Sequence, residues 1–125
     1  MPTPFSSIKW LAIAAILGTG LVHAVEAQDA FGDATYKGLL FAGNGVGALV
    51  AAVGIYRDRR TLGWLLGLLV TGGAAVAYVA SRTMGLPGLP AEPDAWLEPA
   101  GVASLLCEAL FVVLCLRTIR RSHRG

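Results

Sequence analysis

TLGWLLGLLVTGGAAVAYVAS, residues 61–81, is a run of 21 residues without a single charged side chain. A helix needs about 20 apolar residues to cross the hydrocarbon core of a bilayer, so this run predicts a membrane-spanning helix. The run shows no alternation of apolar and polar residues, which a β-barrel strand would require, and a spanning helix satisfies its own backbone hydrogen bonds.

Three other apolar stretches have a comparable length and cover residues 8–27, 36–56 and 99–117. The predicted fold is therefore all-α: an integral membrane four-helix bundle with short loops, forming a single domain over residues 1–125. Hydrophobic residues make up 55% of the chain and charged residues 14%, whereas soluble domains carry about 25% charged residues. This composition excludes a soluble globular domain, a disordered chain and a nucleic-acid-binding module.

The first apolar stretch has an alternative interpretation as a cleaved signal peptide. Lys9 would supply the basic region, and Val25-Glu26-Ala27 resembles a small-x-small cleavage site. Cleavage would leave three spans. An uncleaved first helix is the preferred interpretation.

The basic residues predict one fixed orientation in the membrane. Eight of the ten Lys and Arg residues flank the predicted spans on the same side, namely Lys9, Arg57, Arg59, Arg60, Arg117, Arg120, Arg121 and Arg124. The positive-inside rule places that side in the cytoplasm, so both termini are expected to be cytoplasmic and the membrane to be the inner membrane. The outer connections, over residues 28–35 and 82–98, are rich in acidic residues.

Small residues in the second and third spans predict close helix packing. Gly43 and Gly47 form one G-x-x-x-G pair, and Gly63 and Gly67 form another. Such pairs let the backbones of two helices approach each other in lipid. Contacts within the bundle are the first interpretation, and the seam of a homo-oligomer or a contact with a larger membrane complex is the second.

Glu108 is the one acidic residue well inside a predicted span. An ionised carboxylate near the centre of a bilayer costs several kcal/mol, so Glu108 is expected to be either protonated or paired. Asn44 and Thr71 lie at a similar depth in the second and third spans, and we expect these three side chains to hydrogen-bond to one another. Glu108 is then either a proton or cation site or a neutral acid that sets the helix register.

His23 lies one turn inside the outer end of the first span, and Glu26 follows at i+3 on the same helix face. Histidine and carboxylates together can bind a divalent metal ion. The two residues are weak candidates for such a site, because metal motifs have tighter spacing. A histidine held by a carboxylate at the membrane interface is the more common arrangement.

The segment 82–98 combines charged residues with six Gly and Pro residues in and directly after it, which prevent a regular helix. We expect an ordered outer loop between the third and fourth helices, acting either as a lid over an outer cavity or as a rigid connector. Arg82 can pair with Glu26, Glu92 or Glu98, or bind a phosphate or carboxylate bidentately.

Several of these features recur together in one known pattern. The outer-end His23 is followed by SRT-x-GLP (residues 81–87), by an EP–EPxG segment (residues 92–101) and by Glu108 in the last span. This order resembles a group of small four-span bacterial membrane proteins whose activity is uncharacterised. The resemblance implies the four-span architecture and no particular activity.

Other small membrane proteins match less well. The membrane glutamate of small multidrug transporters lies in the first span, the charge asymmetry here disfavours dual-topology fluoride channels, and the paired cysteines of quinone-linked thiol oxidoreductases are missing. No hydrolase nucleophile motif such as G-x-S-x-G is present.

The function predicted from the sequence is therefore that of a non-enzymatic accessory or ligand-binding membrane protein with an outward-facing polar pocket. The residues expected to form that pocket are His23, Glu26, Asn44, Arg82, Glu92, Glu98 and Glu108. One alternative is an oligomeric small transporter or channel subunit that uses Glu108 as its protonatable site. The other is a metal- or quinone-dependent redox component. No motif indicates a particular cofactor or substrate.

Overall fold

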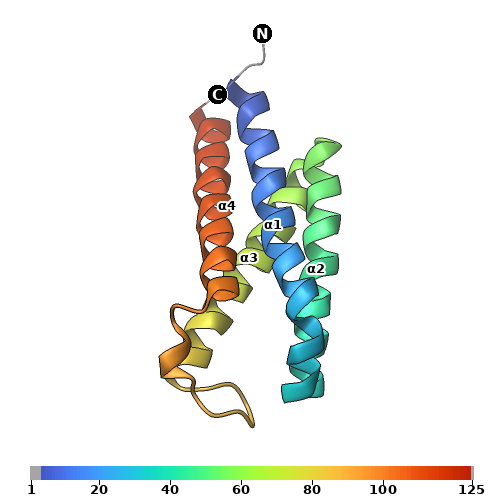
Figure 1. Ribbon diagram of the computed structural model, residues 1–125. Coiled ribbons are helices and arrows are strands. Elements are labelled where there is room, and N and C mark those ends of the chain that lie inside the picture. Colours follow the sequence, from blue (N-terminus) through green and yellow to red (C-terminus); the bar gives the residue numbers. More distant parts are fainter. Residues whose placement is uncertain (1–3, 125) are drawn as a thin grey trace.

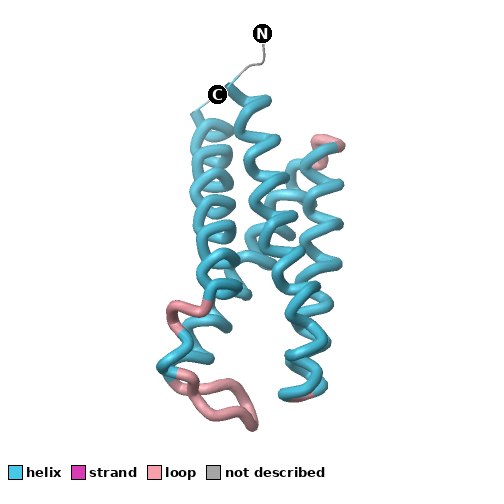
Figure 2. Tube along the Cα trace, viewed as in Figure 1, coloured by secondary structure: helices cyan, strands magenta, loops and turns pink. Residues whose placement is uncertain are grey.

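The computed structural model describes residues 4–124, and within that part the fold is all-α (Figures 1 and 2). Four helices, each long and apolar enough to cross a membrane, pack together, which confirms the predicted architecture. A single-turn 3-10 helix lies in the loop before the last of them. The elements are α1 (Pro4–Asp33), α2 (Thr35–Tyr56), α3 (Arg60–Thr83), η1 (Pro93–Ala95) and α4 (Pro99–Arg124).

The helices follow one another around the bundle in chain order. α1 packs against α2 and α4, and α3 also packs against α2 and α4, so α1 and α3 lie across one diagonal and α2 and α4 across the other. α1 begins and α4 ends at the same end of the bundle (Figure 1).

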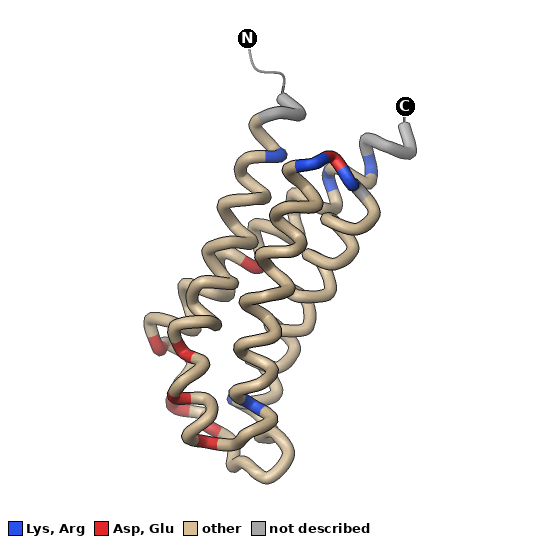
Figure 3. The backbone as a smooth tube through the Cα atoms, turned by 90° about the vertical axis from the view of Figure 1, so that its right-hand side faces the viewer, with Lys and Arg blue, Asp and Glu red and all other residues tan. Residues whose placement is uncertain are grey.

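Charge is divided between the two ends of the bundle (Figure 3). We call the end that holds Lys9, Arg57, Arg59, Arg117 and Arg120 the basic end, and the opposite end, with the loop between α3 and α4, the acidic end. The side chains of Arg60, Arg121 and Arg124 lie outside the described part of the structure.

Two helices are longer than predicted. α1 continues to Asp33, so the predicted connection over residues 28–35 is wrong in its extent, and Ala34 alone separates α1 from α2. This stretch contains no proline, Ala30 is buried, and the ring of Phe31 packs on Gly38 of α2, so tertiary packing continues the helix past its apolar part. Ala34 makes the turn in an extended conformation (φ −165°, ψ 144°). α4 likewise continues beyond residue 117 to Arg124.

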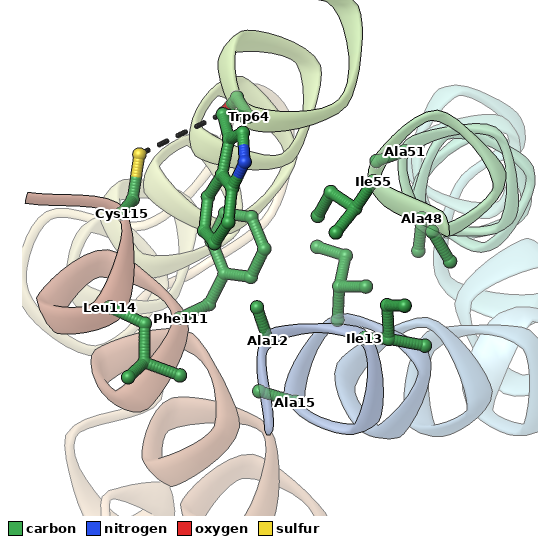
Figure 4. Packing of buried hydrophobic residues seen from close by; sticks show 12 residues of the cluster. Ala12, Ile13, Ala15, Ala48, Ala51, Ile55, Trp64, Phe111, Leu114 and Cys115 are labelled. Atoms are coloured by element: carbon green, nitrogen blue, oxygen red, sulfur yellow. Dashed lines mark hydrogen bonds between the residues drawn. The ribbon is translucent and has the colours of Figure 1, made fainter. Parts of the chain in front are cut away.

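The buried apolar core occupies the half of the bundle nearer the basic end, and Figure 4 shows how its side chains pack. The first apolar stretch supplies Ala12, Ile13, Ala15 and Ile16 to it. Trp64 of α3 and Phe111 of α4 stack with ring centroids 5.5 Å apart. The other core side chains are Ala48, Ala51, Ala52, Ile55, Leu114 and Cys115.

Glycines bring α2 and α3 together near the basic end. A Cβ atom added to Gly63 would lie 2.6 Å from the backbone nitrogen of Ile55, and one added to Gly54 would lie 2.9 Å from Cα of Gly63. Further along α3, a Cβ on Gly67 would lie 2.3 Å from Cζ of Phe111 in α4. Gly63 and Gly67, one of the two predicted pairs, therefore make contacts within the bundle.

Toward the acidic end α2 and α3 diverge (Figure 1). The last close approach of a glycine between them is at Gly47, where an added Cβ would lie 2.9 Å from a methyl group of Val70. A Cβ added to Gly43, Gly72 or Gly73 would meet nothing within 4 Å. This divergence leaves space inside the acidic half of the bundle.

Candidate functional site

A cavity of about 670 Å³ occupies the acidic half of the bundle. This volume falls within the range of roughly 300–1,000 Å³ that is usual for small-molecule sites. All four helices and the loop between α3 and α4 contribute to its lining. Much of the wall is apolar, including Val22, Leu39, Leu40, Leu69, Val70 and Ala74.

The seven residues predicted to form a polar pocket all line this one cavity. His23 and Glu26 come from α1, Asn44 from α2 and Arg82 from the end of α3. The remaining three belong to the loop and α4, namely Glu92, Glu98 and Glu108. The structure therefore brings these residues together, while their role in binding stays a prediction.

Glu108 lies deepest among the acidic residues and is only 2% exposed. Its Oε2 atom accepts hydrogen bonds from Thr19 Oγ1, at 2.7 Å, and from the Ser104 hydroxyl. The two hydroxyls also contact each other at 2.9 Å. Both donors are themselves buried, so the carboxyl group is held by two helices, α1 and α4.

The predicted cluster of Asn44, Thr71 and Glu108 does not form. Asn44 Nδ2 donates to the backbone oxygen of Val70 at 3.3 Å, and Thr71 donates to Gly67 O within its own helix. α2 and α4 lie on a diagonal of the bundle, and Glu108 hydrogen-bonds to α1 instead. Sequence reasoning missed Thr19 and Ser104 as partners, although Ser104 precedes Glu108 by one helical turn.

Asn44 lines the cavity and has one hydrogen-bond acceptor without a partner. Because a carbonyl oxygen only accepts hydrogen bonds, Val70 O fixes the Nδ2 side of the amide as the donor. The other amide atom, Oδ1, is buried and has no hydrogen-bond partner among residues 4–124. A buried acceptor without a donor costs about 1–3 kcal/mol, so a donor that reached this atom would be stabilising.

The His23 ring is fixed by a hydrogen bond to the preceding turn of its own helix. Its Nδ1 atom lies 2.8 Å from the backbone oxygen of Thr19, so Nδ1 carries the proton and donates. The ring also packs against the ring of Phe41 on α2, with the two centroids 5.0 Å apart. In the part of the chain that the structure describes, no group of three or more His, Cys, Asp and Glu side chains is close enough to hold a metal ion. His23 and Glu26 thus gain no third ligand.

The two basic side chains that line the cavity are both held by acids. Arg82 Nη2 lies 3.6 Å from Glu98 Oε2, and the guanidinium also donates to Ala95 O and stacks on the ring of Tyr78. Lys37, which the sequence analysis did not single out, pairs with Asp33 at 2.7 Å. The lining also contains Glu26, Asp29, Glu92 and Glu108, and no ion pair joins these four to a base among the described residues.

The loop between α3 and α4 is tied to the bundle at several points. The backbone nitrogen of Glu92 donates to Ser81 O, Tyr78 donates to Trp96 O, and Tyr36 of α2 donates to Pro87 O. Leu86 and Glu92 of this loop line the cavity. The loop is therefore ordered, and it connects the ends of α2, α3 and α4 around the cavity.

No protein-family model, curated protein or solved structure matches this chain. The loop motifs therefore identify no family, and the interpretation of the cavity depends on its own geometry.

Proposed function

We propose that this multi-pass membrane protein is a non-enzymatic binding protein that holds a small, largely apolar ligand in the cavity at its acidic end. The observation that carries the proposal is the cavity of about 670 Å³, with apolar walls and with the chain's isolated polar residues gathered on its lining. Cavities of this size and composition bury most of the surface of a small ligand, and a few polar groups fix its orientation.

Binding is favoured over transport through one chain because the core fills the other half of the bundle. Below Glu108, toward the basic end, Phe111, Ile16 and Cys115 are completely buried. A small transporter that uses Glu108 as its protonatable site is the second candidate. The observation in its favour is that Glu108 lies between the cavity and this core, held by a network of two hydroxyls.

We further propose that the acidic end faces outward and the basic end faces the cytoplasm of the inner membrane, following the positive-inside rule. In a Cys107→Ser/Cys115→Ser background, a cysteine at exposed Met84 is expected to react with an impermeant maleimide in intact cells. A cysteine at exposed Thr61, near the basic end, should react only after permeabilisation. The opposite pattern would show that the cavity opens to the cytoplasm.

Adjacent glycines of α3 provide a matched test of ligand binding. A Cβ on either Gly72 or Gly73 meets open space, but only Gly73 lines the cavity. Gly73→Trp is therefore expected to fill the cavity and weaken binding at least tenfold, whereas Gly72→Trp should stay within twofold of the original chain.

The measurement uses three probes that share a dansyl group: neutral dansylamide, cationic dansylcadaverine and anionic N-dansyl-6-aminohexanoate. Fluorescence anisotropy is recorded in phosphatidylcholine nanodiscs, and empty nanodiscs correct for partition into lipid. Saturable binding of at least one probe, lost in Gly73→Trp alone, is the expected result. Absence of saturable binding for all three probes, or an equal loss in both variants, would contradict the proposal.

A further inference from the structure

We infer that the cavity selects a hydrophobic organic cation, a protonated amine on an apolar body, with Glu108 as its counter-ion. This inference rests on the proposed function, because it names the class of ligand that the same cavity takes. Three properties of the cavity carry it: its charge, its hydrogen-bond acceptors and its apolar walls.

The charge of the lining favours a cation. Six acidic side chains line the cavity against two basic ones, and each basic side chain is already paired with an acid, Lys37 with Asp33 and Arg82 with Glu98. A cleft lined by an excess of one sign, with walls of low dielectric constant, concentrates ligands of the opposite sign and repels those of the same sign. An anionic ligand would meet neither free arginine nor free lysine on the described lining.

The polar groups at the bottom of the cavity accept hydrogen bonds. Asn44 and Glu108 each lie nine residues from the acidic-end terminus of their helix, Thr35 in α2 and Pro99 in α4. At 1.5 Å per residue both are about 14 Å deep, and they line the cavity from diagonally opposed helices. Asn44 Oδ1 has no donor, and Glu108 adds a carboxylate. An ammonium group, which only donates, complements both.

The walls require that the cation has an apolar body. A small hydrated cation would leave the Leu, Val and Phe side chains of the cavity in contact with water, which is unfavourable for apolar surface. An aliphatic or aromatic amine covers these walls with its body, and its charged group stays at the bottom of the cavity, beside Glu108.

The three dansyl probes test this selectivity directly. Dansylcadaverine is expected to bind at least tenfold more tightly than N-dansyl-6-aminohexanoate, because the two differ chiefly in the charge at the end of a similar chain. This comparison uses the unaltered protein, so it does not depend on the folding of any variant. Equal affinity, or a preference for the anion or for neutral dansylamide, would overturn the inference.

The Glu108→Gln variant tests whether Glu108 causes the preference for the cationic probe. The affinity for dansylcadaverine is expected to fall at least tenfold, whereas the affinity for dansylamide should stay within twofold. Retained dansylamide binding shows that the variant keeps its cavity. The control is Asp58→Asn, which removes an exposed carboxylate at the basic end; Asn tolerates the left-handed backbone at that position (φ 59°). An unchanged cation preference in Glu108→Gln would overturn the role of Glu108.

The possible failures are distinguishable. If a neutral or anionic probe binds best and Gly73→Trp abolishes its binding, the cavity is a ligand site and only the ligand class is wrong. If no probe binds in a way that depends on Gly73, the proposed function itself fails.

Discussion

Replacing Gly63 with alanine is expected to lower the free energy of unfolding by about 1–3 kcal/mol, the usual cost of overpacking a close contact. The added Cβ would lie 2.6 Å from the backbone nitrogen of Ile55 and 2.9 Å from the carbonyl carbon of Gly54. Both are backbone atoms of α2, so no side-chain rotation relieves the contact. α2 and α3 would have to separate where they are most closely packed.

The matched control is Gly72→Ala in the same helix. A Cβ at Gly72 meets nothing within 4 Å, and alanine favours a helix over glycine by about 0.5–1 kcal/mol. Gly72→Ala is therefore expected to be neutral or slightly stabilising. Unfolding of the two variants in mixed micelles, followed by circular dichroism, checks the difference. Equal stability of the two variants would show that the α2–α3 contact at Gly63 does not limit packing.

The helices were predictable because the membrane imposes a simple condition on sequence. A segment of about 20 apolar residues has few alternatives to a spanning helix, and α2 and α3 begin and end within two residues of the predicted spans. The rule describes only the apolar part of a helix. It therefore missed the polar extension of α1 to Asp33, where Phe31 packs on Gly38 of α2.

The depth of the site residues along their helices was predictable, but the rotation of each helix about its axis was not. Counting residues along a span predicts a similar depth for Asn44 and Glu108, and both line the one cavity. Which neighbour each side chain meets depends on the rotation of each helix about its axis, which hydropathy does not specify. Thr19 was missed for a second reason: a threonine in a helix commonly bonds its own backbone, so its sequence does not reveal a partner on another helix.

A second large effect is expected at the contact between α3 and α4. It is tested by making Phe111 smaller and Gly67 larger, singly and together. Phe111 is completely buried, and its ring occupies the space into which a side chain at Gly67 would project. In lipid the transfer part of the cost of Phe111→Ala is small, because lipid tails are as apolar as the core. The void remains, and roughly 100 Å³ at about 24 cal/mol per Å³ gives about 2 kcal/mol of destabilisation.

Gly67→Leu alone is expected to destabilise by about 1–3 kcal/mol, because its Cβ would lie 2.3 Å from Cζ of Phe111. In the double variant the leucine enters the space that the ring has left. The double variant should then be more stable than the sum of the two losses by at least about 1 kcal/mol. Gly72→Leu measures the gain in helix propensity separately, so that it can be subtracted. Strictly additive losses would mean that residue 67 does not project into the space of the Phe111 ring, and that α3 and α4 pack with a different rotation.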